Sequence, residues 1–140
     1  MRPELAAICE IHRLGLVYLF GSLATQGLAY LSGAEAGPTD PLADLDVGVV
    51  TLDPLPEPGP RVDLYASIHN DLADVFRAFQ VDLSFLEEGH SVFQAAAIGG
   101  MCVFSAGEQL REDYEMRVLR RAADFRPVLR EFHREILEDL

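Results

Sequence analysis

The sequence predicts an α+β fold, in which a small sheet is covered by helices and followed by a helical C-terminal tail. Apolar runs of strand length alternate with longer segments whose apolar residues recur every three or four positions, which is typical of a sheet with helices packed on it. The four strand-length runs are residues 16–20, 45–52, 81–85 and 101–105. This pattern leaves open whether the strands run parallel or in mixed directions.

The first three elements follow from local signals. Pro3 occupies a first-turn position that proline favours, so a helix is expected to begin there, with Gly15 as its C-cap. Residues 16–20 are apolar throughout and bounded by glycines, which predicts a buried strand. Residues 23–31 predict a second helix, which Gly27 weakens.

A proline-rich connection and a long helix come next. The prolines at positions 54, 56, 58 and 60 cannot donate to a strand ladder, so residues 53–60 are predicted to form an exposed loop. The clearest helix of the chain begins at about Arg61. Its apolar residues recur at helical spacing: Val62, Tyr65, Ile68, Leu72, Val75 or Phe76, and Phe79.

The last part of the chain is predicted to be mainly helical. Residues 91–98 predict a short alanine-rich helix before the fourth strand, and the pattern is helical from about residue 108 to the end. Pro127 is expected to kink this segment or to start a new helix. We therefore expect one domain over residues 1–140, with residues 108–140 as a helical C-terminal extension.

Composition restricts the class of protein. A chain of 140 residues with 49% hydrophobic residues can bury a core without disulfides, so Cys9 and Cys102 are expected to be buried, reduced thiols. No apolar run is long enough to cross a bilayer and no signal-peptide segment is apparent, which predicts a cytoplasmic protein. The net charge of −12 argues against nucleic acid as the main partner and favours a basic one.

Three aspartates are the candidate catalytic residues. Asp44 and Asp46 are two positions apart at the start of a strand, so their side chains point to the same face, about 6.6 Å apart along it. Asp82 alternates with apolar neighbours in the next strand, which allows a third carboxylate to join them. The alternative is a solvated acidic turn at a strand start.

Crowded carboxylates of this kind predict a metal site. They repel one another unless a proton or a cation neutralises them, and hard oxygen ligands select Mg²⁺ or Mn²⁺. In a two-metal site one ion activates the attacking oxygen and the other stabilises the leaving phosphate. Asp44, Asp46 and Asp82 are thus predicted metal ligands in phosphoryl or nucleotidyl transfer.

Gly21 and Ser22 are the candidate phosphate-binding residues. Gly21 allows a sharp turn after the first strand, and Ser22 is placed to cap the next helix, whose free N–H groups attract anions. The same two residues also serve many purely structural turns. The chain has neither a P-loop nor a Gly-x-Gly-x-x-Gly motif, so those nucleotide-binding classes are not indicated.

These motifs together resemble the minimal nucleotidyltransferase family of MntA-like (MNT) antitoxins. Its members are small relatives of the DNA polymerase β superfamily and are often encoded beside HEPN-domain toxins. The resemblance covers nearly the whole chain through Leu19-Phe20-Gly21-Ser22, Ala24 and Gly27, Asp44-Leu45-Asp46, and Val81-Asp82-Leu83. It implies a nucleotidyltransferase (DNA polymerase β-like) fold with a small, mostly mixed sheet.

The resemblance also implies an activity. Antitoxins of this family transfer AMP from ATP to a tyrosine of the partner toxin. Carried over, Asp44 and Asp46 bind Mg²⁺ (or Mn²⁺), Asp82 is a further ligand or the base, and Gly21 and Ser22 hold the triphosphate. The implied partners are ATP and a HEPN-domain toxin, with no membrane and no nucleic acid, and homodimerisation is left open.

Two departures from the family pattern keep alternatives open. The family turn reads Gly-Ser-x-Ala-Arg-Gly, whereas residues 21–27 lack the arginine and are one residue longer, and the segment 23–43 is also longer than usual. The alternatives are nucleotide transfer to a small molecule such as an aminoglycoside, which needs an acceptor cleft, and a catalytically inactive toxin-binding module.

The histidines and the C-terminal arginines have simpler interpretations. His12, His69, His90 and His133 are scattered, and we expect surface or hydrogen-bonded helix residues rather than metal ligands. Arginines recur along the C-terminal helical segment and are expected to pair with nearby carboxylates: Arg117, Arg120, Arg121, Arg126, Arg130 and Arg134.

Overall fold

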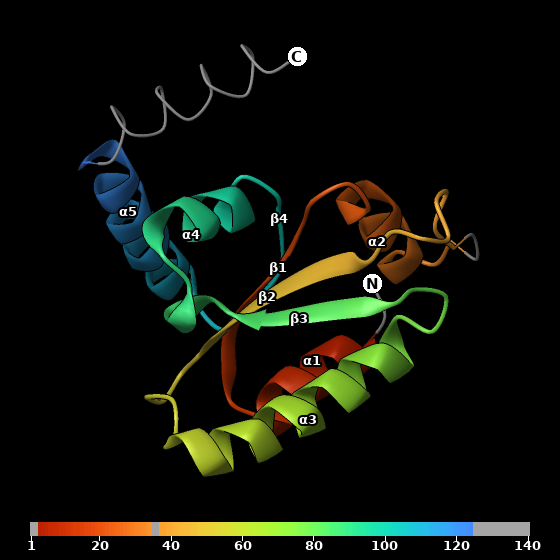
Figure 1. Ribbon diagram of the computed structural model, residues 1–140, viewed down its shortest axis with the longest axis horizontal. Helices are drawn as coiled ribbons and strands as arrows, with labels where there is room; N and C mark the ends of the chain where they lie inside the picture. Colours follow the sequence, from red (N-terminus) through yellow and green to blue (C-terminus); the bar gives the residue numbers. More distant parts are fainter. Residues whose placement is uncertain (1–2, 35–36, 125–140) are drawn as a thin grey trace.

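The computed structural model describes residues 3–34 and 37–124. Its centre is a four-stranded mixed sheet with the strand order β3-β2-β1-β4 (Figure 1). The strands are β1 (Leu14–Phe20), β2 (Leu45–Thr51), β3 (Val81–Phe85) and β4 (Met101–Ser105). Strand β1 pairs antiparallel with β2 and with β4, whereas β2 and β3 run parallel. The predicted α+β class with a mixed sheet is confirmed.

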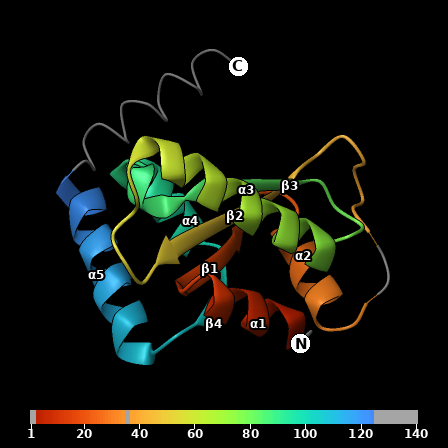
Figure 2. The same cartoon turned by 90° about the horizontal axis from the view of Figure 1, so that it is seen from below.

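Helices cover both faces of this sheet (Figures 1 and 2). The first face carries α1 (Pro3–Ile11), α2 (Ala24–Leu31) and α3 (Pro58–Val75), whose buried residues share one apolar core with Val17, Leu19, Val47 and Val49 of the strands. The second face carries α4 (Ser91–Ile98) and α5 (Glu108–Asp124). Their buried residues pack on Leu16, Tyr18, Phe20 and Val50.

Strand β1 is buried at all seven positions because it lies inside the sheet and contributes to both cores. Its side chains alternate, with Val17 and Leu19 in the first core and Leu16, Tyr18 and Phe20 in the second. A strand covered on both faces is expected to be apolar without interruption, and its sequence shows this run.

The end of the first helix differs from the prediction. Helix α1 ends at Ile11, and the chain turns toward β1 at Arg13, which has a positive φ of 52°. Gly15 is not a C-cap, since it lies inside β1, where an added Cβ would be 2.9 Å from Leu110 and 3.1 Å from Leu52. Gly15 is therefore a packing residue of the sheet.

The start of the third helix also differs. Helix α3 begins at Pro58, so two of the four prolines belong to its first turn, where backbone N–H groups have no helical partner to lose. Ile68, Leu72 and Val75 are buried as predicted, whereas Val62 is 67% exposed. Tyr65 is 36% exposed as well, so the buried stripe begins at Ile68, six residues later than the spacing indicated.

The remaining bounds largely agree with the sequence. The predicted bounds of β3, α4 and β4 coincide with the observed ones, and a short 3₁₀ helix, Leu86–Glu88, was not predicted. The predictions for Pro127 and the rest of the tail fall on residues 125–140, outside the described part of the chain. Over the described residues, no helix combines the length and apolarity that crossing a bilayer requires.

The two cysteines provide a test of the core. Cys9 is 1% exposed, and burial raises the pKa of its thiol to about 12. Because the thiolate is the reactive form, we expect Cys9 of the Cys102→Ala variant to react with a thiol reagent at pH 8 only as fast as the protein unfolds. The labelling rate is measured with and without denaturant. Rapid labelling of Cys9 in the folded protein would contradict this packing.

Candidate active site

Two of the three predicted aspartates lie side by side. Asp46 of β2 is the register partner of Asp82 of β3, and parallel neighbours in a sheet lie about 4.8 Å apart. Their side chains point to the face that carries α4 and α5, since Leu45, Val47 and Leu83 of the same strands are buried in the opposite core. The two carboxyl groups are within hydrogen-bonding contact.

The electrostatics of Asp46 follow from this contact. Its partial burial raises the pKa of its carboxyl group, and the negative charge and hydrogen bond of Asp82 and the charge of Asp44 raise the pKa further. The ionised form of Asp46 is therefore disfavoured unless a positive charge is present. A cation bound between the two carboxylates removes this penalty.

Asp44 takes a different position. It lies one residue before β2, is exposed, and acts on Asp46 through its charge. Across residues 3–34 and 37–124, no group of three His, Cys, Asp or Glu side chains is arranged to hold a metal ion. The protein thus offers two convergent carboxylates and one nearby. Because Mg²⁺ commonly binds through one or two carboxylates together with substrate phosphates, this donor set fits that ion.

The Gly-Ser turn is in contact with the same aspartate. The last residue of β1, Phe20, is the register partner of Asp46, and Gly21 follows with a positive φ of 78°. A Cβ built on Gly21 would collide with the carboxylate of Asp46. Glycine is therefore required at this position both for its backbone conformation and for the space beside Asp46.

Ser22 does not cap the second helix, contrary to prediction. The N-cap position of α2 is Leu23, and no side chain makes a cap hydrogen bond there. Ser22 is exposed, and its hydroxyl makes no hydrogen bond with any residue that the structure describes. The hydroxyl of Ser22 therefore remains available to a ligand beside Gly21, whereas the first N–H group of α2, that of Ala24, donates to the carbonyl of Gly21 at 3.3 Å.

A pocket of about 340 Å³ opens next to this turn. It lies between the end of β1 and the segment that joins α4 to β4, and its lining residues are mostly small: Phe20, Gly21, Ala24, Ala96, Gly99, Gly100 and Met101. A Cβ on Gly100 would collide with the backbone of Leu19. Sequence reasoning missed these residues, although the Gly99-Gly100 pair between a helix and a strand was a visible turn signal.

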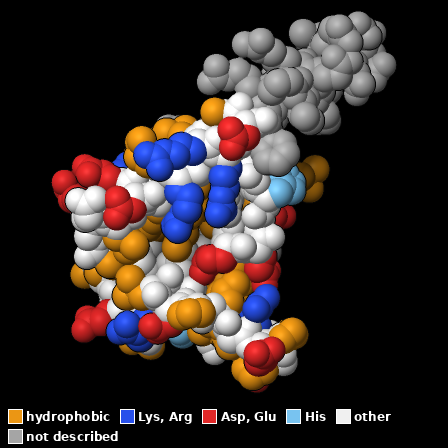
Figure 3. All heavy atoms as spheres, turned by 90° about the vertical axis from the view of Figure 1, so that its left-hand side faces the viewer, with side chains coloured by type: hydrophobic (Ala, Val, Ile, Leu, Met, Phe, Trp, Pro, Cys, Tyr) orange, Lys and Arg blue, Asp and Glu red, His pale blue; other side chains and the backbone are white. Residues whose placement is uncertain are grey.

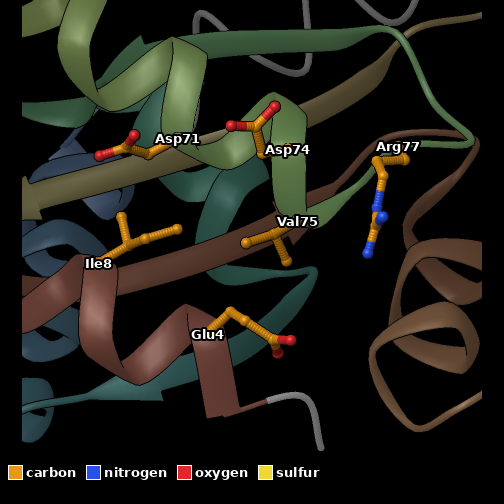
Figure 4. A pocket seen from close by; sticks show the side chains of 6 residues that line it. All are labelled: Glu4, Ile8, Asp71, Asp74, Val75 and Arg77. Atoms are coloured by element: carbon orange, nitrogen blue, oxygen red, sulfur yellow. The ribbon is translucent and has the colours of Figure 1, made fainter.

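A second pocket is remote from the aspartates. It has a volume of about 310 Å³ and lies between α1 and α3, on the other face of the sheet (Figure 4). Glu4, Asp71 and Asp74 give it an acidic rim, with Arg77 at one end. It contains none of the predicted site residues, and we assign the candidate site to the carboxylates and the turn instead.

The histidines behave largely as predicted. Nε2 of His12 is 2.7 Å from a carboxylate oxygen of Asp71, and Nε2 of His69 is 3.1 Å from the carbonyl oxygen of Val81. His90 precedes α4, and its Nδ1 accepts a hydrogen bond from the N–H of Phe93. His133 falls outside the described residues.

The arginines of α5 do not pair as expected. Figure 3 shows several arginines gathered on the face formed by α4 and α5. Arg111 forms an ion pair with Glu115, and the guanidinium of Arg117 lies 5.8 Å from the centre of the Tyr114 ring. Arg117, Arg120 and Arg121 form no ion pair with any residue in 3–34 or 37–124. Arg126, Arg130 and Arg134 are not described.

The fold and this arrangement define a class of protein. The four-stranded mixed sheet with helices on both faces has the fold of solved MntA and MNT antitoxin structures. The predicted resemblance is confirmed at the level of the fold.

Particular solved structures share this fold. A mutant of the MntA–HepT toxin–antitoxin pair, with two aspartates two positions apart changed to glutamate, is similar with a TM-score of 0.60 and 17% identity, covering 97% of this chain and 94% of that one. A toxin–antitoxin structure with AMP-PNP has a TM-score of 0.58 and 18% identity, with 97% and 94% coverage. No family model and no curated protein sequence matches the chain.

A third similar structure comes from Shewanella oneidensis. It is a tri-AMPylated HEPN toxin in complex with an MNT antitoxin. Its TM-score is 0.54 at 17% identity, with coverage of 97% of this chain and 92% of that one.

The contact between Gly21 and Asp46 predicts a difference between two glycine variants. Gly21→Ala places a Cβ against Asp46 and also strains the backbone, whereas Gly33→Ala strains a backbone of φ 110° with no atom within 4 Å of the Cβ. We expect about 1–2 kcal/mol of lost stability from the backbone in both, and a further loss in Gly21→Ala alone. Urea unfolding measures both. Equal losses would show that Gly21 does not press on Asp46.

The raised pKa of Asp46 predicts a stabilising substitution. Without divalent cations at pH 7, Asp46→Asn removes a disfavoured charge and is expected to stabilise the fold by up to about 1 kcal/mol, the range for solvent-screened pairs. A raised pKa of Asp46 lowers the stability of the folded protein only at pH values above the ordinary pKa of aspartate. The stability gained by Asp46→Asn should therefore shrink as the pH falls toward about 4. Thermal unfolding at several pH values tests this. A destabilised variant at pH 7 would contradict it.

Proposed function

We propose that the protein is a Mg²⁺-dependent nucleotidyltransferase of the antitoxin type, which transfers AMP from ATP to a hydroxyl of a HEPN-type toxin. The observation that carries the proposal is that Gly21 lies against the carboxylate of Asp46, which is the register partner of Asp82 in the neighbouring strand. A phosphate-binding turn and paired carboxylates at one point are what nucleotidyl transfer requires.

The metal is assigned to the carboxylates. Asp46 and Asp82 would hold it, with Asp44 as a further donor from the segment before β2. When bound, Mg²⁺ neutralises the charge of the carboxylates and of the phosphates that they face. The raised pKa of Asp46 is consistent with this assignment, because its partial burial, and after it the charges of Asp82 and Asp44, disfavour the ionised carboxylate that a cation would stabilise.

The triphosphate is assigned to the Gly-Ser turn. Gly21 allows the backbone to approach the phosphates, and the exposed hydroxyl of Ser22 is free to donate to them. The pocket between Gly21 and Gly100 lies directly beside this turn and offers room for the rest of the nucleotide.

The transfer step then requires a base. Asp82 lies on the edge strand and is exposed, so an acceptor hydroxyl can reach it. We assign Asp82 to accept the hydroxyl proton as the acceptor oxygen bonds to the α-phosphorus of ATP, while pyrophosphate leaves. The main contributions of the chain are the positioning of the two reactants and the exclusion of alternative geometries.

Similar structures support the choice of nucleotide and partner. One of them contains AMP-PNP, and another pairs an MNT antitoxin with an AMPylated HEPN toxin. The two mutated aspartates of a third have the same spacing as Asp44 and Asp46.

The deciding experiment uses ATP that carries the label on the α-phosphate. With Mg²⁺ and a HEPN-domain toxin of the kind present in the similar complex, we expect label on that toxin, and none when the label is on the γ-phosphate. Asp46→Asn and Asp82→Asn are expected to lower the rate on the order of 100-fold, as removal of a charge-stabilising group does. Asp74→Asn, on the exposed side of α3, is the matched control.

The other outcomes distinguish the alternatives. Label on an aminoglycoside but not on the toxin would favour a small-molecule nucleotidyltransferase. A stable complex without label would favour an inactive toxin-binding module, in keeping with the absent arginine in residues 21–27. Full activity of Asp46→Asn would contradict the assignment of the carboxylates as metal ligands.

A further inference from the structure

Strand β3 carries Asp82 at an edge of the sheet. It pairs with β2 on one side, and its other side faces α3, which runs beside it (Figures 1 and 2). The backbone N–H and C=O groups of successive residues in a strand point to opposite sides. Those of Asp82 and Ser84 therefore point toward β2, and those of Val81 and Leu83 point away from it. The N–H of Leu45 donates to the carbonyl of Gln80, in agreement with this alternation.

Two side chains of α3 bind the outward carbonyls of this edge. The hydroxyl of Tyr65 donates to the carbonyl oxygen of Leu83 at 2.8 Å, and Nε2 of His69 lies 3.1 Å from the carbonyl oxygen of Val81. Since a carbonyl can only accept, Nε2 of His69 must carry the proton. The two bonds therefore flank Asp82, one on each side along the chain.

The two side chains also support each other. They are one helical turn apart, and their rings stack with centroids 6.2 Å apart and planes inclined by 14°. The ring of Tyr65 also packs edge-on against Phe85 of β3, at 5.9 Å and 70°. Ile68 and Leu72 anchor the same helix in the core. The hydrogen-bonding side chains are thus held by packing rather than by the bonds alone.

The hydroxyl of Tyr65 lies in the field of the active-site carboxylate. Partial burial and the charge of Asp82 both raise the pKa of Tyr65, so it stays a neutral donor across the physiological range.

We propose that Tyr65 and His69 are positioning residues, which hold β3 in register and thereby keep the carboxylate of Asp82 against Asp46. An edge strand with one paired side can fray, and each bond to an outward carbonyl opposes that opening. The consequence for catalysis rests on the proposed function. The two hydrogen bonds from Tyr65 and His69 to β3, called the clamp below, can be tested without any substrate.

The first test is amide hydrogen exchange of the protein without metal or nucleotide. Tyr65→Phe removes one hydroxyl and retains the ring, and His69→Leu removes the other donor. We expect exchange of the Asp82 and Ser84 amides to accelerate by roughly five- to tenfold in each, as the loss of one hydrogen bond allows. Amides of β1 and β4 should be unchanged.

Two matched variants complete this test. Tyr114→Phe makes the same chemical change at a buried hydroxyl that has no hydrogen-bond partner among the described residues, so β3 should exchange as in the original protein. His69→Gln retains an N–H donor and should restore much of the protection. Unchanged exchange of β3, or equal acceleration throughout the sheet, would overturn the proposal.

The second test measures the position of Asp82 through Mn²⁺ binding, followed by electron paramagnetic resonance of the free ion. We expect Tyr65→Phe and His69→Leu to weaken binding roughly tenfold, the low end for groups that orient metal ligands, with His69→Gln intermediate. Faster exchange with unchanged Mn²⁺ affinity would show that the clamp holds the strand but not the site. If the original protein neither binds Mn²⁺ nor transfers label, the proposed function fails, and the exchange result still decides the clamp.

Discussion

The candidate site depends on the register of three neighbouring strands. Phe20 at the end of β1 pairs with Asp46 of β2, and Asp46 pairs with Asp82 of β3, so the turn after β1 and both carboxylates lie in one row across the sheet. Side chains alternate between the faces of a strand, so a slip of one residue would bury the aspartates in the first core and expose its apolar residues. The same apolar burial that stabilises the fold therefore fixes the site.

The two cores keep this register in place from both faces. On the first face, Leu45, Val47 and Val49 pack against α2 and α3. On the second face, the positions after Asp46 are Gly48 and Val50, and an added Cβ on Gly48 would be 2.8 Å from Leu86. The strand that carries Asp46 is thus enclosed by apolar contacts next to Asp46. Asp46 is only partly buried and Asp82 is exposed, so a ligand can reach the carboxylates there.

The sequence predicted the strands and the approach of Asp82 to Asp46 because these depend on period-two alternation, whereas Asp44, predicted to project beside Asp46 from the same strand, lies one residue before that strand. Asp46 and Asp82 are both flanked by apolar residues, and each was assigned to the correct face from that pattern alone. It could not predict the end of α1 or the packing role of Gly15, because Arg13 adopts its positive φ in a tertiary context. Ser22 was misassigned as a cap because cap preference is local, whereas the path of residues 21–23 follows the contact with Asp46.

His69 shows how a correct local interpretation can leave a role undiscovered. It was predicted to be a hydrogen-bonded helix residue, which it is, but its partner is an edge carbonyl that lies next to Asp82 and twelve residues away in the chain. The strand order had to be known before that carbonyl could be identified as unpaired by the sheet.

The need for such a clamp follows from the electrostatics of the site. Two neighbouring carboxylates repel each other equally, and the strand that can move in response is the one paired on one side only, which is β3. Without the bonds from α3, the least costly relief would be for β3 to open at Asp82, and the pair that binds a cation would be lost before the cation arrived. Holding the edge strand from α3 keeps the carboxylates close in the absence of a ligand. The free energy needed to bring them together is therefore supplied by folding and not by cation binding.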